Sequence, residues 1–144
     1  MVFMSHSYSN VWIHMILVTK FRKPFIKHWL EADFHDFLKK ELLKCGGNFI
    51  VINGTENHIH ILYHHPITLS ISHVAKQLKG SSSRWFNLHF EVGEKFQWQV
   101  GFSAFSVSQS QTDRVYHYII NQKSIHLRRE VEKEIEALRR LNGC

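Results

Sequence analysis

The sequence predicts an α+β fold in which short strands and helices alternate around one sheet. Two kinds of hydrophobic periodicity carry this prediction: some stretches are rich in β-formers or alternate apolar and polar residues, whereas others repeat apolar residues every three or four positions. Their order is strand, helix, strand, strand, helix, strand, helix. That order is the split β-α-β arrangement of ferredoxin-like folds, with an additional C-terminal helix.

The first strand is expected from Val11 to Lys20, a stretch rich in β-forming residues that Pro24 follows. The first helix starts near Leu30, because apolar residues recur at helical spacing as far as Leu42. The glycine pair at 46–47 then supplies a typical helix end.

The next two strands form a predicted hairpin. Residues 49–52 and 59–63 are short β-rich runs, and the segment between them contains the turn signal Asn53-Gly54. The second helix follows, with Ser70 as its N-terminal cap, and it runs to or past Gly80.

The last elements are a strand and a helical stretch. Residues 96–107 alternate between apolar and small or polar side chains, with Gly101 among them. This pattern predicts a fourth strand, and the glycine is a site for a bulge. A helix beginning at Ser110 or Thr112 carries Tyr118. A charged amphipathic tail follows, and its apolar positions are Val131, Ile135 and Leu138.

Length and composition limit the class of protein. The 144 residues suffice for one domain, which we expect to span residues 1–144, and 44% hydrophobic residues with 11 Phe exclude a disordered chain. No apolar run reaches the roughly 20 residues of a membrane-spanning helix, and the N-terminus lacks the pattern of a signal peptide, so we expect a cytoplasmic protein without a membrane partner. Cys45 and Cys144 show no CxxC spacing, which argues against a disulfide framework and a cysteine zinc site.

The charge balance points toward a polyanionic partner without deciding the question. Lys and Arg outnumber Asp and Glu by 18 to 12, which gives a net charge of +6. The same excess is equally expected of a protein that only needs to stay soluble.

The most informative motif is His58-Ile59-His60. Alternate side chains of a strand share a face, so His58 and His60 project together, about 6–7 Å apart, while Ile59 and Ile61 face the core. Two imidazoles at this separation can chelate one metal ion. In a chain with 12 His, chance placement is the competing explanation.

A second pair, Tyr118 and Gln122, has the spacing of residues on one helix face. A phenol beside a carboxamide suits a tyrosine nucleophile with an oxygen ligand for the metal. The alternative is a core tyrosine and a solvated glutamine.

Together these motifs make the chain similar to a known family, the HUH single-strand tyrosine transposases of small insertion sequences and of bacterial repetitive palindromes. The resemblance covers nearly the whole chain, and five pieces carry it in order: His14 to Pro24, Asn57 to Leu62, Leu78 to Arg84, Trp98 to Ser108, and Tyr118 to Lys123.

The resemblance implies a metal-dependent transposase that cleaves and rejoins single-stranded DNA at insertion-sequence ends. His58, His60 and Gln122 would hold one Mg²⁺ or Mn²⁺, and these ligands would also bind zinc. Tyr118 would attack the phosphorus and form a 5′-phosphotyrosine intermediate. Tyr116 is the competing nucleophile, and the match of the YxxxQ segment favours Tyr118.

The implied partners are hairpin-bearing single-stranded DNA at the element ends and a second copy of the chain. Relatives are homodimers in which the tyrosine helix of one chain can complete the site of the other. In this chain, the polar break at 121–124 would let the C-terminal helix swing away from its own sheet, and the apolar stripe of the tail would pack on the partner. Stacking on unpaired bases is expected of Trp85, Phe86 or Trp98. The residues expected to neutralise phosphates are basic side chains near the first strand and second helix: Lys20, Arg22, Lys23, Lys76, Lys79 and Arg84.

Three alternatives remain open from the sequence. A non-catalytic ferredoxin-like nucleic-acid-binding protein would not use either motif and would bind nucleic acid without metal. A zinc protein would use some of His58, His60, His64 and His65 without cutting DNA. A different or repurposed HUH nuclease would share the motifs.

Overall fold

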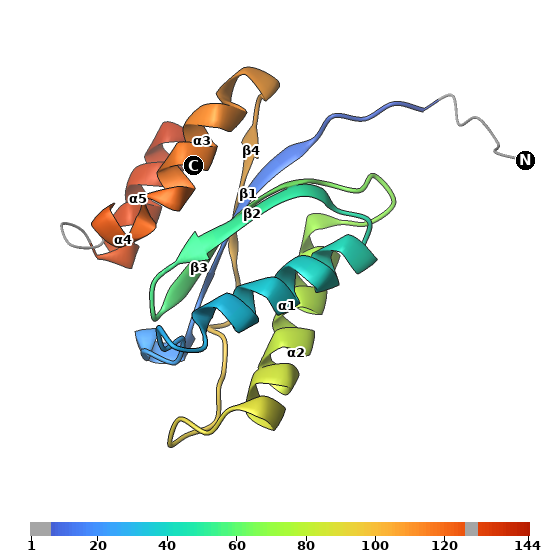
Figure 1. Cartoon of the computed structure of the whole chain (residues 1–144). Coiled ribbons are helices and arrows are strands. Elements are labelled where there is room, and N and C mark those ends of the chain that lie inside the picture. The colour runs from blue at the N-terminus through green and yellow to red at the C-terminus, as the bar shows by residue number, and fades with distance from the viewer. Residues whose placement is uncertain (1–6, 126–129) are drawn as a thin grey trace, which may run out of the picture.

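A four-stranded antiparallel sheet lies at the centre of the molecule (Figure 1). The computed structural model describes residues 7–125 and 130–144. The strand order is β2-β3-β1-β4, and the ranges are β1 (Trp12–Val18), β2 (Asn48–Gly54), β3 (His58–His64) and β4 (Ser103–Val107). This order confirms the predicted α+β, ferredoxin-like fold.

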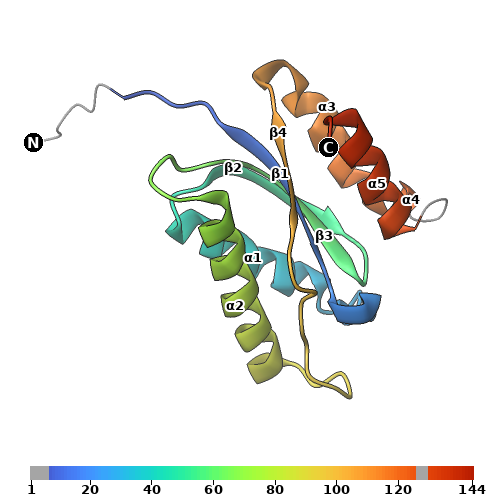
Figure 2. The same ribbon diagram turned by 180° about the vertical axis from the view of Figure 1, so that it is seen from behind.

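The two faces of the sheet are covered by different helices, as Figures 1 and 2 show from opposite sides. Helices α1 (Glu31–Lys44) and α2 (Ile71–His89) cover one face and enclose the hydrophobic core. The strands contribute alternate residues to that core, for example Met15 and Leu17 from β1 and Ile59 and Ile61 from β3. The residues between them face the other side, under the C-terminal helices.

Helices α1 and α2 form where their apolar periodicity predicts. Ser70 caps α2 as expected, because its hydroxyl accepts a hydrogen bond from the backbone amide of His73 at 3.0 Å. The helix continues past Gly80 to His89. After α1, Gly46 adopts a φ of +92°, a left-handed conformation that glycine takes without strain.

The fourth strand is shorter than predicted. Only Ser103–Val107 pairs with β1, whereas Trp98 forms a single isolated bridge with Thr19. Between these two points Gly101 has a φ of +88°, which takes the chain out of the extended conformation and interrupts the ladder. The predicted strand over 96–107 is therefore wrong in its first half.

The C-terminal region departs from the single predicted tyrosine helix. The helical stretch breaks at Asn121 into α3 (Thr112–Ile120) and the short α4 (Gln122–Ile125), so Tyr118 and Gln122 lie on different helices. The amphipathic tail forms α5 (Val131–Leu141), and Val131 is buried within the same chain. Two short 3₁₀ segments, Lys20–Arg22 (η1) and Gln109–Gln111 (η2), complete the fold. None of the helices in residues 7–125 and 130–144 combines the length and the hydrophobicity that a membrane-spanning segment requires.

Candidate active site and nucleic-acid interface

His58 and His60 lie side by side on β3, on the face of the sheet away from the core. Their ring centroids are 5.2 Å apart, and both side chains are wholly buried. Ile59 and Ile61 point to the opposite face and belong to the core, as predicted. The strand alternation therefore brings the two imidazoles together as the sequence indicates.

Neighbouring side chains orient both imidazole rings. The Nδ1 of His58 lies 2.8 Å from Asn57 Oδ1 and 3.0 Å from Thr55 Oγ1, and the Nδ1 of His60 lies 2.7 Å from His14 Nε2. An amide oxygen can only accept, so a protonated Nδ1 of His58 donates to Asn57, while its Nε2 lies 3.1 Å from a second amide oxygen, that of Gln122. Such contacts through Nδ1 fix the ring orientation of metal-binding histidines.

His14 was not among the residues assigned a role from the sequence. It lies on β1 directly beside His60 and is almost wholly buried. Burial, which is the largest cause, and the proximity of His60 together lower the pKa of His14 from 6.5 to about 3, against an opposing effect of Glu134. His14 therefore remains a neutral hydrogen-bonding partner at ordinary pH.

Tyr118 and Gln122 converge on the same histidines, although they lie on separate helices. The Oε1 of the buried Gln122 is 3.1 Å from His58 Nε2. The ring of Tyr118 is 5.7 Å from that of His60, centroid to centroid. Tyr116, by contrast, is 44% exposed, and the ring it contacts is that of its neighbour His117. Within one chain, Tyr118 is thus the tyrosine of this pair that lies beside the histidines.

Glu134 on α5 is a further member of the site that the sequence analysis missed. Its Oε1 accepts hydrogen bonds from the Tyr118 hydroxyl and from Gln122 Nε2 (3.0 Å), and it lies 2.8 Å from His60 Nε2. Its side chain is wholly buried. The signal was present in the tail, because Glu134 occupies a position of the stripe formed by Val131, Ile135 and Leu138, where a charge is unexpected.

The carboxyl group of Glu134 is held in its ionised form. Burial raises its pKa, but the hydrogen bond and charge of His60 overcome this effect, with help from Tyr118 and His58, and the pKa falls well below its usual range. The site therefore holds a carboxylate in contact with imidazole, phenol and amide groups.

This set of side chains fits a divalent metal ion. His58, His60 and Glu134 each offer one ligand atom, and these atoms all lie within 4.8 Å of one another. The Oε1 of Gln122 adds an amide oxygen beside His58. Imidazole, amide and carboxylate ligands suit Mn²⁺ and Zn²⁺, and the oxygen ligands suit Mg²⁺.

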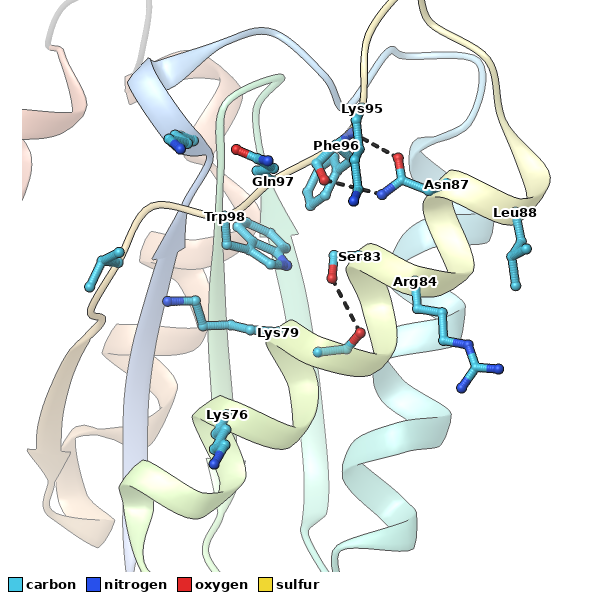
Figure 3. A pocket seen from close by; sticks show the side chains of 13 residues that line it. Lys76, Lys79, Ser83, Arg84, Asn87, Leu88, Lys95, Phe96, Gln97 and Trp98 are labelled. Carbon is cyan, nitrogen blue, oxygen red and sulfur yellow. Dashed lines mark hydrogen bonds between the residues drawn. The ribbon is translucent and has the colours of Figure 1, made fainter.

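Four of the six predicted phosphate-binding residues line one groove. The groove has a volume of about 820 Å³ and runs between α2 and the segment 95–100 (Figure 3). It lies beside α2, which covers the face of the sheet opposite His58 and His60. The basic residues that line it are Lys20, Lys76, Lys79 and Arg84, together with Lys95.

The other two predicted residues have acidic partners elsewhere. Arg22 forms an ion pair with Glu132 on α5, and Lys23 Nζ lies 2.5 Å from Glu94 Oε2. In the groove itself, Lys79 Nζ donates to the carbonyl oxygens of Gln99 (2.6 Å) and Gly101 (2.7 Å). Lys79 thus ties α2 to the irregular segment before β4.

The aromatic residues expected to stack on bases have different environments. Phe86 is wholly buried in the core, so it is wrong as a base-stacking residue. Trp98 lines the groove but is 8% exposed, and its indole Nε1 donates to Ser82 Oγ at 2.9 Å. Trp85 is partly exposed and stacks against Phe37, with ring centroids 4.7 Å apart.

Comparison with known proteins identifies relatives of this fold and sequence. A family model described as IS200-like transposase matches residues 7–122. Among solved structures, a protein described as a transposase from Deinococcus radiodurans R1 is similar, with a TM-score of 0.64, 20% identity, and coverage of 85% of this chain and 98% of that one. A REP-associated tyrosine transposase bound to a REP hairpin is also similar, with a TM-score of 0.56, 14% identity, and coverage of 88% and 74%. No curated protein matches the chain.

Proposed function

The chain belongs to the IS200-like transposase family, and we propose that it cleaves and rejoins single-stranded DNA through a covalent bond to Tyr118. One observation carries this proposal: the phenol of Tyr118, which is partly exposed, converges with the buried imidazoles of His58 and His60 and the buried amide of Gln122. A chain that only bound nucleic acid would have no need for this convergence.

The proposed reaction consists of two transesterifications. The Tyr118 oxygen attacks the scissile phosphorus, the bond from phosphorus to the 3′-oxygen breaks, and a 5′-phosphotyrosine ester and a free 3′-hydroxyl result. The attack of another 3′-hydroxyl on the phosphotyrosine releases Tyr118 and joins new strands. Each step exchanges one phosphodiester-type bond for another, so no nucleotide cofactor is consumed.

His58, His60 and Gln122 are the proposed protein ligands of a Mg²⁺ or Mn²⁺ ion. When bound, the ion polarises the scissile phosphate and stabilises charge on the departing 3′-oxygen. The protein orients its own ligands, because Asn57 and His14 hold the Nδ1 atoms of the two imidazoles.

The basic groove beside α2 is the proposed contact surface for the DNA outside the cleavage point. Lys20, Lys76, Lys79 and Arg84 can neutralise phosphates there. The structural neighbour bound to a REP hairpin supports hairpin DNA at the element ends as the partner. Four phosphate contacts on duplex DNA predict that log K falls with log salt concentration with a slope of about −3.6. Arg22 and Lys23 would also contact phosphates if they left Glu132 and Glu94, and six contacts would steepen the slope to about −5.4.

Formation of a covalent adduct tests the proposal directly. The protein is incubated with single-stranded DNA from the flanks of its own gene and with Mg²⁺ or Mn²⁺, and a denaturation-resistant complex is sought on a gel. Wild type and Tyr116→Phe should form the adduct, whereas Tyr118→Phe should not. Loss of the adduct in Tyr116→Phe alone would contradict the assignment of the nucleophile.

A homodimer with the tyrosine helix completing the partner's site remains part of what the family resemblance implies. The contact between Tyr118 and His60 of the same chain instead favours a site complete in one chain. Mixing a His60→Ala chain with a Tyr118→Phe chain separates the two arrangements. Recovered adduct formation supports the arrangement in trans, and its absence supports the arrangement in cis.

A further inference from the structure

The site that would bind the scissile phosphate is closed. His58, His60, Gln122 and Glu134 each have no solvent-exposed surface. A phosphodiester must touch the Tyr118 oxygen and approach the two imidazoles before it can react. Helix α5, which carries Glu134, contacts these groups directly and contributes to their burial.

Glu134 makes the contacts that an anionic substrate group would make at this place. Its Oε1 accepts the hydrogen bond of the Tyr118 hydroxyl and that of Gln122, and it lies 2.8 Å from His60 Nε2. A carboxylate and a phosphodiester are both anions with oxygen acceptors, so the same donors satisfy either one. The two groups therefore compete for one position.

A second acidic residue of α5 contacts a residue predicted to bind phosphate. Glu132 pairs with Arg22 at the exit of β1. This ion pair is about half exposed at both side chains. Helix α5 thus places one carboxylate on the catalytic groups and another on a basic side chain that the proposed function assigns to DNA.

A small groove lies where α5 meets the sheet. Its volume is about 370 Å³, and the residues that line it include Ile16 and Val18 of β1 and Ile135 of α5, so displacement of the helix would open the groove further. Phe102, which is 41% exposed, also lines it. Apolar and aromatic walls of this kind suit the faces of unstacked bases.

We propose that α5 is an internal occupant of the DNA-binding face, in which Glu134 and Glu132 take the places of DNA phosphates until the DNA strand displaces the helix. This inference rests on the proposed function, because it concerns access to the same site. It makes the helix an inhibitory element: DNA pays the free energy of undocking α5 before it reaches Tyr118.

The test compares two variants of α5, each of which removes one negative charge. Glu134→Gln removes the buried carboxylate, and Glu136→Gln removes an exposed one that pairs with Arg140 on the same helix. Binding of fluorescent single-stranded DNA is measured by anisotropy without divalent metal, so that no cleavage occurs. Because hydrogen bonds to a charged group are the strong ones, Glu134→Gln should raise the affinity by about tenfold, and Glu136→Gln by less than about twofold.

Two further measurements separate inhibition from other roles of Glu134. Amide hydrogen exchange over residues 131–141 of the wild type should accelerate when single-stranded DNA is added. Glu132→Gln, which changes an exposed side chain and spares the buried cluster, should raise the DNA affinity by a smaller factor of about two to three. Thermal unfolding of each variant verifies that the fold is intact.

Several results would overturn the proposal. An unchanged or weaker DNA affinity of Glu134→Gln would do so, as would unchanged exchange of α5 on DNA binding. A joint loss of Mn²⁺ affinity and adduct formation in Glu134→Gln would make Glu134 a permanent part of the working site. If the wild type forms the adduct but one of these contrary results is obtained, the proposed function stands without this inference. If the wild type forms no adduct, the proposed function itself fails.

Discussion

Replacing His14 tests whether its contact with His60 orients that imidazole for metal binding. His14 Nε2 lies 2.7 Å from His60 Nδ1, and burial lowers the pKa of His14 to about 3, so it is a neutral partner at pH 7. Loss of a partner of this kind typically lowers metal affinity about 10- to 100-fold, or about 1.4–2.8 kcal/mol. We expect His14→Ala to weaken Mn²⁺ binding by this factor, because the His60 ring loses the contact that fixes its orientation.

The assay is titration with Mn²⁺, followed by electron paramagnetic resonance of the free ion. His28→Ala is the matched control, since it removes an exposed histidine. His14→Gln should recover part of the affinity, because its amide oxygen can accept from His60 Nδ1. His14→Ala also leaves a buried nitrogen unpaired, which costs about 1–3 kcal/mol of stability, so urea unfolding is measured in parallel. If folded His14→Ala binds Mn²⁺ as tightly as His28→Ala, the orienting role of His14 is refuted.

Three further predictions concern stability. Burial lowers the pKa of His35 from 6.5 to about 4, so the folded chain binds fewer protons than the unfolded chain between these values and loses stability as the pH falls through this window. The loss from His35 is about 2 kcal/mol at pH 5, and urea unfolding of His35→Leu should show a correspondingly smaller pH dependence. Gly54→Ala would place a Cβ atom 2.1 Å from the His58 carbonyl oxygen, so we expect a clear drop in melting temperature and in Mn²⁺ affinity. Ser82→Ala leaves the buried indole N–H of Trp98 without its acceptor, and should cost about 1–3 kcal/mol in urea unfolding.

Local sequence patterns predicted the features of the structure that depend on a single strand or helix. The alternation of β3 predicted that His58 and His60 share a face, and the cap at Ser70 predicted the start of α2. The strand order also followed from the sequence of elements, because a split β-α-β unit permits few arrangements. The first two inferences depend on neighbours within a few residues, and the third depends on the order of the elements along the chain.

The contributions of Glu134 and His14 could not be predicted in the same way. Glu134 reaches Tyr118 because α5 folds back onto the sheet, and this docking depends on contacts between distant segments. His14 acquires its role from the register of β1 with β3, which places it near His60. Likewise, Arg22 and Lys23 were grouped with the groove residues by sequence proximity, although their ion pairs direct them to Glu132 and Glu94.

The pairing register of β2 and β3 determines which face of the sheet His58 and His60 occupy. A strand has a side-chain period of two, so a slip of one residue in β3 would turn Ile59 and Ile61 toward Tyr118 and bury His58 and His60 in the apolar core. The paired register of Gly54 with Ile59 prevents this slip, because at Gly54 the absence of a side chain allows the two strands to approach closely. Burial of two isoleucines on the core face favours the same register by about 3–6 kcal/mol relative to exposure. The hydrophobic face of β3 therefore fixes which of its residues can meet a metal ion.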